Sequence, residues 1–166
     1  MTLSAISGRS PDGALYEFFI DKSKYGDCLN IWWPYVRGES WGACGGDGLP
    51  PSTAFGRRNP EEVFAKPFGF LNDAPRATTH RLISGFARTN VHRVRVVYLD
   101  RDGARHEAPV QLTQLNARKL EPLGDSEPFG FWVAFVPRSA GHRPIEVTAY
   151  AAGGERLGAP FTLQRP

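Results

Sequence analysis

Alternation of apolar and polar residues with a period of two is the dominant pattern along the second half of the chain. In residues 91–99, Val94 and Val96 fall on one face of an extended segment, and Arg93 and Arg95 fall on the other. The Asp-Gly pair that ends at Gly103 supplies the positive φ angles that a tight hairpin turn requires. The pattern therefore predicts a half-buried strand followed by a hairpin.

The same kind of argument predicts strands along most of the chain. They fall at residues 14–20, 28–33 and 39–44 in the first half, and at 80–88, 91–99, 105–112, 129–136, 143–150 and 156–163 in the second half. Regularly spaced strands with turn residues between them are typical of a β-sandwich. We expect a mainly β fold, in which an immunoglobulin-like β-sandwich carries an N-terminal, disulfide-bearing β-hairpin subdomain.

The strand pattern is interrupted between residues 52 and 79, and this gap sets the expected domain organisation. Residues 1–60 are assigned to the hairpin subdomain, residues 61–77 to a linker or long loop, and residues 78–166 to the sandwich. Within the gap, residues 59–66 are predicted to form a short helix or a loop, because Asn59 is a good helix cap and Pro60 suits a first turn.

Composition narrows the class of protein. The chain has 166 residues with 18 Gly and 14 Pro, which favours many short strands joined by turns over long helices. The net charge of +3 is spread among interspersed acidic and basic residues, so we expect no nucleic-acid partner. No apolar run is long enough to cross a bilayer, and the first residues lack the basic and apolar segments of a signal peptide.

The two cysteines lie at the two ends of a predicted hairpin that folds about residues 34–38. This arrangement brings Cys28 and Cys44 opposite each other, and we favour a disulfide over two free thiols or a metal or redox use. A disulfide indicates an oxidising compartment, and hence a secreted protein or a membrane-anchored ectodomain whose signal or anchor was removed before Met1. The alternative is a cytoplasmic protein with reduced cysteines.

Aromatic residues are concentrated on this hairpin, where three of the four tryptophans fall within ten residues. A hairpin does not bury both faces unless each is covered, so most of these rings are expected in a core between the two halves. Trp32 and Tyr35 are expected outside, where Trp and Tyr rings bind sugars and protein partners. The candidate binding residues are Trp32, Tyr35, Trp41, and the loop pair Arg57 and Arg58, which suits carboxylate or phosphate capture.

Catalytic and metal-binding patterns are not found. The four histidines fall on different predicted strands or turns, and no Gly-x-Ser-x-Gly motif occurs. His106 and Glu107 are neighbours on one strand, so they point to opposite faces and do not act together. We therefore expect no catalytic residue, no metal ligand and no cofactor.

Several strand-and-turn segments resemble a known but uncharacterised domain. In the second half these are residues 91–100, the Asp-Gly pair at Gly103, and residues 107–110, 130–137 and 145–154. They resemble an actinobacterial extracytoplasmic β-sandwich found at the C-terminal end of anti-sigma-factor-like membrane proteins. In the first half, residues 7–8, 11–13, 28–29 and 44–45 are similar to the disulfide-bearing segment that often precedes that domain. The resemblance implies an extracytoplasmic, non-enzymatic module that reaches the membrane only through an anchor absent from this chain.

These arguments lead to one expected function and two alternatives. We expect a non-enzymatic extracytoplasmic sensing or binding module that recognises a protein or a glycan at the cell envelope. The alternatives are a structural or assembly protein without a small ligand, and a small envelope hydrolase.

Overall fold

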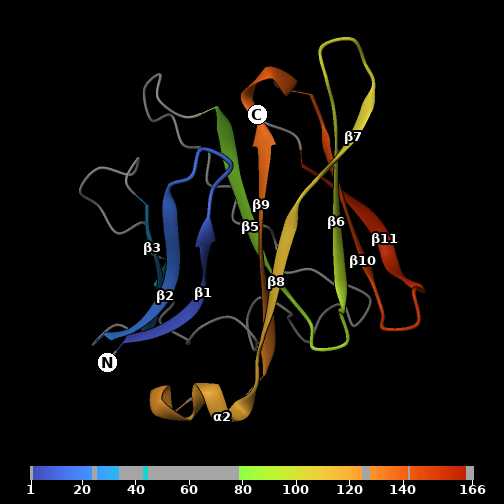
Figure 1. Ribbon diagram of the computed structural model, residues 1–166. Coiled ribbons are helices and arrows are strands. Elements are labelled where there is room, and N and C mark those ends of the chain that lie inside the picture. The colour runs from blue at the N-terminus through green and yellow to red at the C-terminus, as the bar shows by residue number, and fades with distance from the viewer. Residues whose placement is uncertain are drawn as a thin grey trace.

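The protein is mainly β and contains three antiparallel sheets. The computed structural model describes residues 2–23, 26–33, 43–44, 79–124, 128–141 and 143–163. The strands are β1 (Thr2–Arg9), β2 (Leu15–Ser23), β3 (Gly26–Trp32), β4 (Ala43–Cys44), β5 (His80–Ala87), β6 (Arg93–Leu99), β7 (Arg105–Ala108), β8 (Val110–Leu115), β9 (Phe129–Pro137), β10 (Ile145–Tyr150) and β11 (Arg156–Leu163). Short helical turns are α2 (Ala117–Leu120), η1 (Glu121–Leu123) and η2 (Arg138–Ala140). The expected β-sandwich-like, mainly β fold is confirmed (Figure 1).

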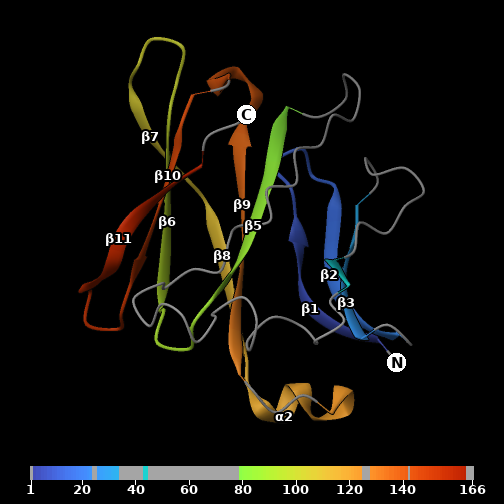
Figure 2. The same cartoon turned by 180° about the vertical axis from the view of Figure 1, so that it is seen from behind.

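The three sheets form three layers. Sheet A has the strand order β1-β2-β3-β4, sheet B has the order β5-β9-β8, and sheet C has the order β11-β10-β6-β7. Sheet B lies between the other two, as the views from the front and from behind both show (Figures 1 and 2). Two separate hydrophobic cores therefore exist, one on each face of sheet B.

Strand β9 joins the two cores because its side chains alternate between them. Phe131 and Phe135 belong to the core shared with sheet A, whereas Trp132 and Ala134 belong to the core shared with sheet C. Residues 129–136 are all buried, which explains why this strand reads as an almost unbroken apolar run in the sequence. β9 is also paired on both sides, with β5 and with β8.

The core between sheets A and B is aromatic. Phe18 of β2 lies with its ring centroid 4.9 Å from that of Phe131, and Phe86 of β5 lies 5.3 Å from Phe131 on the other side. Tyr16 packs edge-on against Phe135, with 5.3 Å between the centroids. Such tilted and edge-to-face contacts stabilise a core beyond the apolar area they bury.

The segment predicted as one strand over residues 105–112 is two strands in two different sheets, so this prediction was wrong. β7 ends at Ala108 in sheet C, and β8 begins at Val110 in sheet B. Pro109 stands between them, and proline lacks the N–H group that would continue either ladder. The chain thus passes from one layer to the next at this residue.

Strand β1 was not predicted, because a bulge hides its alternation. The pairing with β2 shifts register between Ser4 and Ile6, and as a result the consecutive residues Ala5 and Ile6 are both buried. The short helix α2 was missed as well, although Asn116 caps it by accepting a hydrogen bond from the Lys119 N–H at 2.9 Å.

The hairpin turn predicted at Gly103 is confirmed, and the turn predicted about residues 34–38 lies outside the described residues. The β6–β7 hairpin turns at Gly103, which has φ of 85°, and the β10–β11 hairpin turns at Gly154, which has φ of 90°. The helix or loop predicted over residues 59–66 lies outside the described residues. No helix in the described part of the chain is long and apolar enough to cross a membrane.

The aromatic core gives a first testable expectation. Phe131→Ala should lower the free energy of unfolding by about 3–5 kcal/mol, because it removes a fully buried ring between two sheets. Leu15→Ala, at a half-exposed position on β2, is the control and should change it by less than about 0.5 kcal/mol. Urea unfolding followed by circular dichroism measures both; equal effects would contradict the proposed role of the Phe131 core.

Candidate functional site

The outer face of sheet A, which points away from sheet B, carries the candidate site. In β2 the side chains of Tyr16 and Phe18 point inward and are buried in the core. Leu15 and Glu17 alternate with them and so belong to the opposite face. Across the ladder, Glu17 is the register partner of Trp32 at the end of β3.

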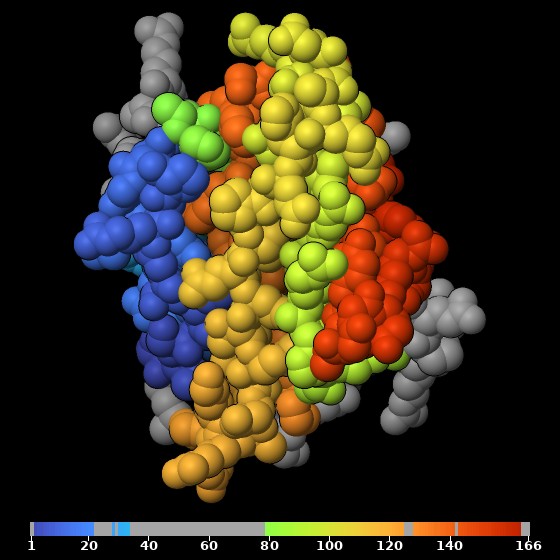
Figure 3. Space-filling view, turned by 45° about the vertical axis from the view of Figure 1, so that its right-hand side comes forward, coloured from blue at the N-terminus to red at the C-terminus, as the bar shows by residue number. Residues whose placement is uncertain are grey.

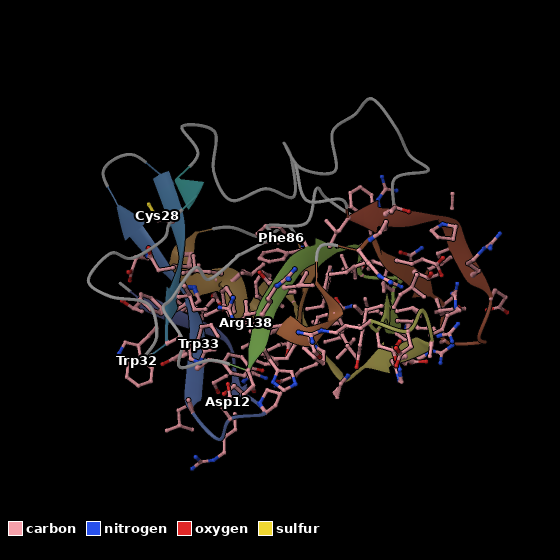
Figure 4. The ribbon with its side chains drawn as sticks, turned by 90° about the horizontal axis from the view of Figure 1, so that it is seen from above. Asp12, Cys28, Trp32, Trp33, Phe86 and Arg138 are labelled. Carbon is pink, nitrogen blue, oxygen red and sulfur yellow. The ribbon has the colours of Figure 1, made fainter. Side chains whose placement is uncertain are left out.

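Trp32 and Leu15 are the exposed large apolar side chains among the described residues, at 54% and 50% exposure. They lie next to each other, because Trp32 is directly opposite Glu17 and Leu15 is two residues before Glu17 on the same face. We call Leu15, Glu17 and Trp32 the Trp32 patch. In Figure 4, Trp32 lies at the edge of the molecule, whereas Trp33 lies further inward.

The alternation of side chains along β3 explains why Trp32 is exposed and its neighbour Trp33 is buried. Ile31 and Trp33 are buried in the core with sheet B, at 4% and 2% exposure, and Trp32 between them points outward. The prediction that Trp32 is exposed is confirmed. Tyr35, Trp41, Arg57 and Arg58 lie outside the described residues, so their role as binding residues stays a prediction.

Leu15 and Glu17 were missed as candidate residues, although the sequence held a signal for them. The strand predicted over residues 14–20 already placed both on the face opposite to Tyr16 and Phe18. The sequence did not predict that this strand pairs with β3, and it is this pairing that brings Glu17 beside Trp32.

Among the side chains of sheet A and its turns that the structure describes, Asp12, Glu17 and Asp21 are acidic and Arg9 is basic. Asp21 accepts a hydrogen bond from the Asn30 side-chain amide at 3.0 Å and another from the Thr2 hydroxyl. Glu17 has no ion pair with any described residue.

A cluster of Asp12, Thr79 and His80 connects the β1–β2 turn to the start of β5. The Thr79 hydroxyl donates to Asp12 Oδ1, and its oxygen lies 2.7 Å from His80 Nδ1. Because the hydroxyl proton goes to the carboxylate, His80 Nδ1 is the donor toward the hydroxyl oxygen. In a nucleophile–histidine–acid relay the histidine accepts that proton instead, so this geometry is that of a clamp between sheets A and B.

The described histidines are otherwise engaged or solvated. His106 Nε2 lies 2.7 Å from Asp100 Oδ2, and the His106 ring stacks on Tyr98 with centroids 5.5 Å apart. The hydrogen bond from His106 and those from the backbone N–H groups of Ala104 and Asp102 hold the pKa of Asp100 below its usual value. Glu107 instead pairs with Arg95, so His106 and Glu107 have separate partners. Among the described residues, no group of three or more His, Cys, Asp or Glu is placed to hold a metal ion.

The pairing of β3 with β4 places the two cysteines opposite each other. Cys28 is the register partner of Cys44, and Leu29 is the partner of Ala43. Cys28 is buried, and no cysteine in the described part of the chain is free. The prediction that these two positions meet across a hairpin is confirmed for its two described arms.

Tyr16 connects sheet A to the edge strand of sheet B. Its hydroxyl donates to Gln111 Oε1 of β8, and the Gln111 side-chain amide donates to the Ser7 carbonyl at 3.0 Å. Gln111 thus ties two strands of sheet A to the edge of sheet B. Burial of the phenol raises the pKa of Tyr16 to about 12.

Comparison with protein-family models, with curated proteins and with solved structures finds no match for this chain.

The raised pKa of Tyr16 is testable by ultraviolet titration of the phenols. A phenol that ionises at about 12 in the folded protein and near 10 when unfolded favours the fold below pH 10, and this contribution is lost as the pH rises toward 12. Tyr16→Phe should remove one high-pH step from the titration and make stability less sensitive to pH between 10 and 12. Loss of a step near pH 10 in place of the high-pH step would contradict the raised pKa of Tyr16.

Proposed function

We propose that this protein is a non-enzymatic extracytoplasmic binding module that recognises a protein or a glycan at the cell envelope through the Trp32 patch. The observation that carries the proposal is the exposure of Trp32 beside Glu17 and Leu15 on an otherwise well-packed sheet. Large apolar side chains gathered on a surface mark interaction sites more often than scattered single ones do.

The chemistry of the patch favours a sugar ring as the ligand. A tryptophan face stacks on the apolar C–H face of a pyranose, and a neighbouring carboxylate accepts hydrogen bonds from its hydroxyl groups. Trp32 and Glu17 are cross-strand partners, so ring and carboxylate are held side by side by the backbone ladder. Leu15 widens the apolar area, and this residue favours a protein partner as the second candidate.

Two features support a binding role over a catalytic one. The Asp12–Thr79–His80 cluster is arranged as a clamp, with the hydroxyl proton directed to the carboxylate. The strongly raised phenol pKa of Tyr16 belongs to a group buried in the core rather than in a cleft.

We also propose that sheets B and C form an immunoglobulin-like sandwich. Their seven strands divide as three and four, and the two sheets share a core. The order β5-β9-β8 corresponds to strands B-E-D, and the order β11-β10-β6-β7 corresponds to G-F-C-C′ of that fold. This proposal is compatible with the resemblance to the actinobacterial extracytoplasmic domain.

The extracytoplasmic location rests on a proposed Cys28–Cys44 disulfide. The β3–β4 register supports it, because directly opposed positions on neighbouring antiparallel strands bring two cysteines to bonding distance. Such a bond is typical of proteins that fold in an oxidising compartment.

The ligand proposal is tested by titrating the protein with chitooligosaccharides and other neutral envelope-type oligosaccharides by isothermal titration calorimetry, while the tryptophan fluorescence of the unsubstituted protein is followed in parallel. Binding with a blue shift is expected, and Trp32→Ala should weaken it by about tenfold or more, equivalent to about 1.4 kcal/mol. Trp32→Phe, which keeps an aromatic face, should retain most of the affinity. Oligosaccharide binding that Trp32→Ala leaves unchanged would refute the patch as the glycan site.

The disulfide is tested by thiol alkylation of the denatured protein, followed by intact-mass measurement with and without reductant. We expect alkylation of two cysteines only after reduction, and a Cys28→Ser/Cys44→Ser variant less stable by about 3 kcal/mol. Two alkylated thiols without reductant would contradict the disulfide and the location inferred from it.

A further inference from the structure

The outer face of sheet C is a second exposed surface, on the side of the molecule away from sheet A. The strand order there is β11-β10-β6-β7, and Figure 3 shows the yellow-green atoms of β6 next to the orange-red atoms of the β10–β11 hairpin. Val94 and Val96 of β6 and Ala149 of β10 point into the core with sheet B. The residues that alternate with them therefore point outward, and they include Arg93, Arg95 and Tyr150.

One row across these strands is arginine, tyrosine, arginine. Tyr150 of β10 is the register partner of Arg93 on one side and of Arg156 on the other. The Arg93 guanidinium lies over the Tyr150 ring, 4.2 Å from its centroid, and this contact holds the cation on the surface. We call Arg93, Tyr150 and Arg156 the arginine row.

The charges next to the row are already paired. Arg95 Nε donates to Glu107 Oε2 at 2.8 Å, and Arg105 Nη2 donates to Glu146 Oε1 at 3.4 Å. Arg93 and Arg156, both exposed, have no ion pair with any described residue. Two uncompensated positive charges thus remain at one end of the face.

The net charge of sheet C and its turns is also positive. Residues 91–108 and 143–163, which contain sheet C and its turns, include six Arg against five Asp and Glu. A negatively charged partner is therefore attracted to the arginine row rather than to sheet C as a whole.

We propose that the arginine row binds an acidic polysaccharide, with Arg93 and Arg156 each pairing with a carboxylate of the chain. Neighbouring strands are about 4.8 Å apart, so the two arginines start from backbone positions about 10 Å apart on a flat surface. Guanidinium groups recognise carboxylates through paired N–H donors. A thin polymer lying along the row meets both arginines and avoids Glu107 and Glu146.

Two other polyanions fit this surface less well. A planar anionic membrane in contact with the whole face would also meet the carboxylates of Glu107 and Glu146. Single-stranded nucleic acid binds best where bases stack on a free aromatic face, and the guanidinium of Arg93 occupies a face of Tyr150.

The experiment measures binding of oligogalacturonate to the full chain by isothermal titration calorimetry at low ionic strength. Arg93→Gln/Arg156→Gln should weaken binding about tenfold or more, and Arg156→Gln alone should weaken it about threefold to fivefold. Arg101→Gln removes the same charge at the far end of the β6–β7 hairpin and should change affinity less than about twofold. Circular dichroism of each variant checks the fold, and Arg156→Gln is an exposed change that leaves the core intact.

Three results would overturn the proposal. They are no binding of oligogalacturonate, an equal loss in the Arg101→Gln control, and tighter binding of oligo-dT or of vesicles containing phosphatidylglycerol than of oligogalacturonate. Trp32→Ala is expected to leave oligogalacturonate binding unchanged, and Arg93→Gln/Arg156→Gln to leave neutral oligosaccharide binding unchanged. Failure of this proposal is thereby distinguishable from failure of the Trp32 patch.

Discussion

The burial of both faces of β9 is the constraint on which the rest of the structure depends. A strand that sends Phe131 to one side and Trp132 to the other needs an apolar layer on each side. Sheet A satisfies the first need and sheet C the second. The two outer sheets then each have one face in a core and one face toward solvent, and these outer faces are where the candidate binding residues lie. The arrangement of the surfaces is thus a consequence of how the middle layer is covered.

Much of the fold was predictable because the relevant signals are local. Alternation identified β6 and β11, and Gly103 marked the hairpin between β6 and β7. The errors occurred where the pairing with another strand, and not the local pattern alone, determines the structure. The bulge in β1 places Ala5 and Ile6 together in the core and removes the expected period, and Pro109 divides a continuous pattern between two sheets. The bulge is not visible without knowing the partner strand, whereas Pro109 is a local signal against one continuous strand.

The candidate surfaces were predictable to a smaller extent for the same reason. The sequence identified Trp32 from the density of aromatic residues, and alternation put Arg93 and Arg95 on one polar face. It did not identify Glu17 as the neighbour of Trp32, because that proximity arises from the β2–β3 register. Likewise the row through Tyr150 exists only once β10 is paired with both β6 and β11. The sequence pattern identifies which residue types are candidates for binding, and the pairing of strands determines which of these residues lie next to each other.

The crossing at Pro109 couples the hydrogen-bonding registers of two sheets. On one side of this residue Ala108 is aligned with Val96 in sheet C, and on the other Val110 is aligned with Ala134 in sheet B. With a single residue between the two alignments, a slip of either ladder displaces the other. A one-residue slip also turns every side chain of a strand to the wrong face. The crossing at Pro109 therefore fixes the strand register of sheets B and C together.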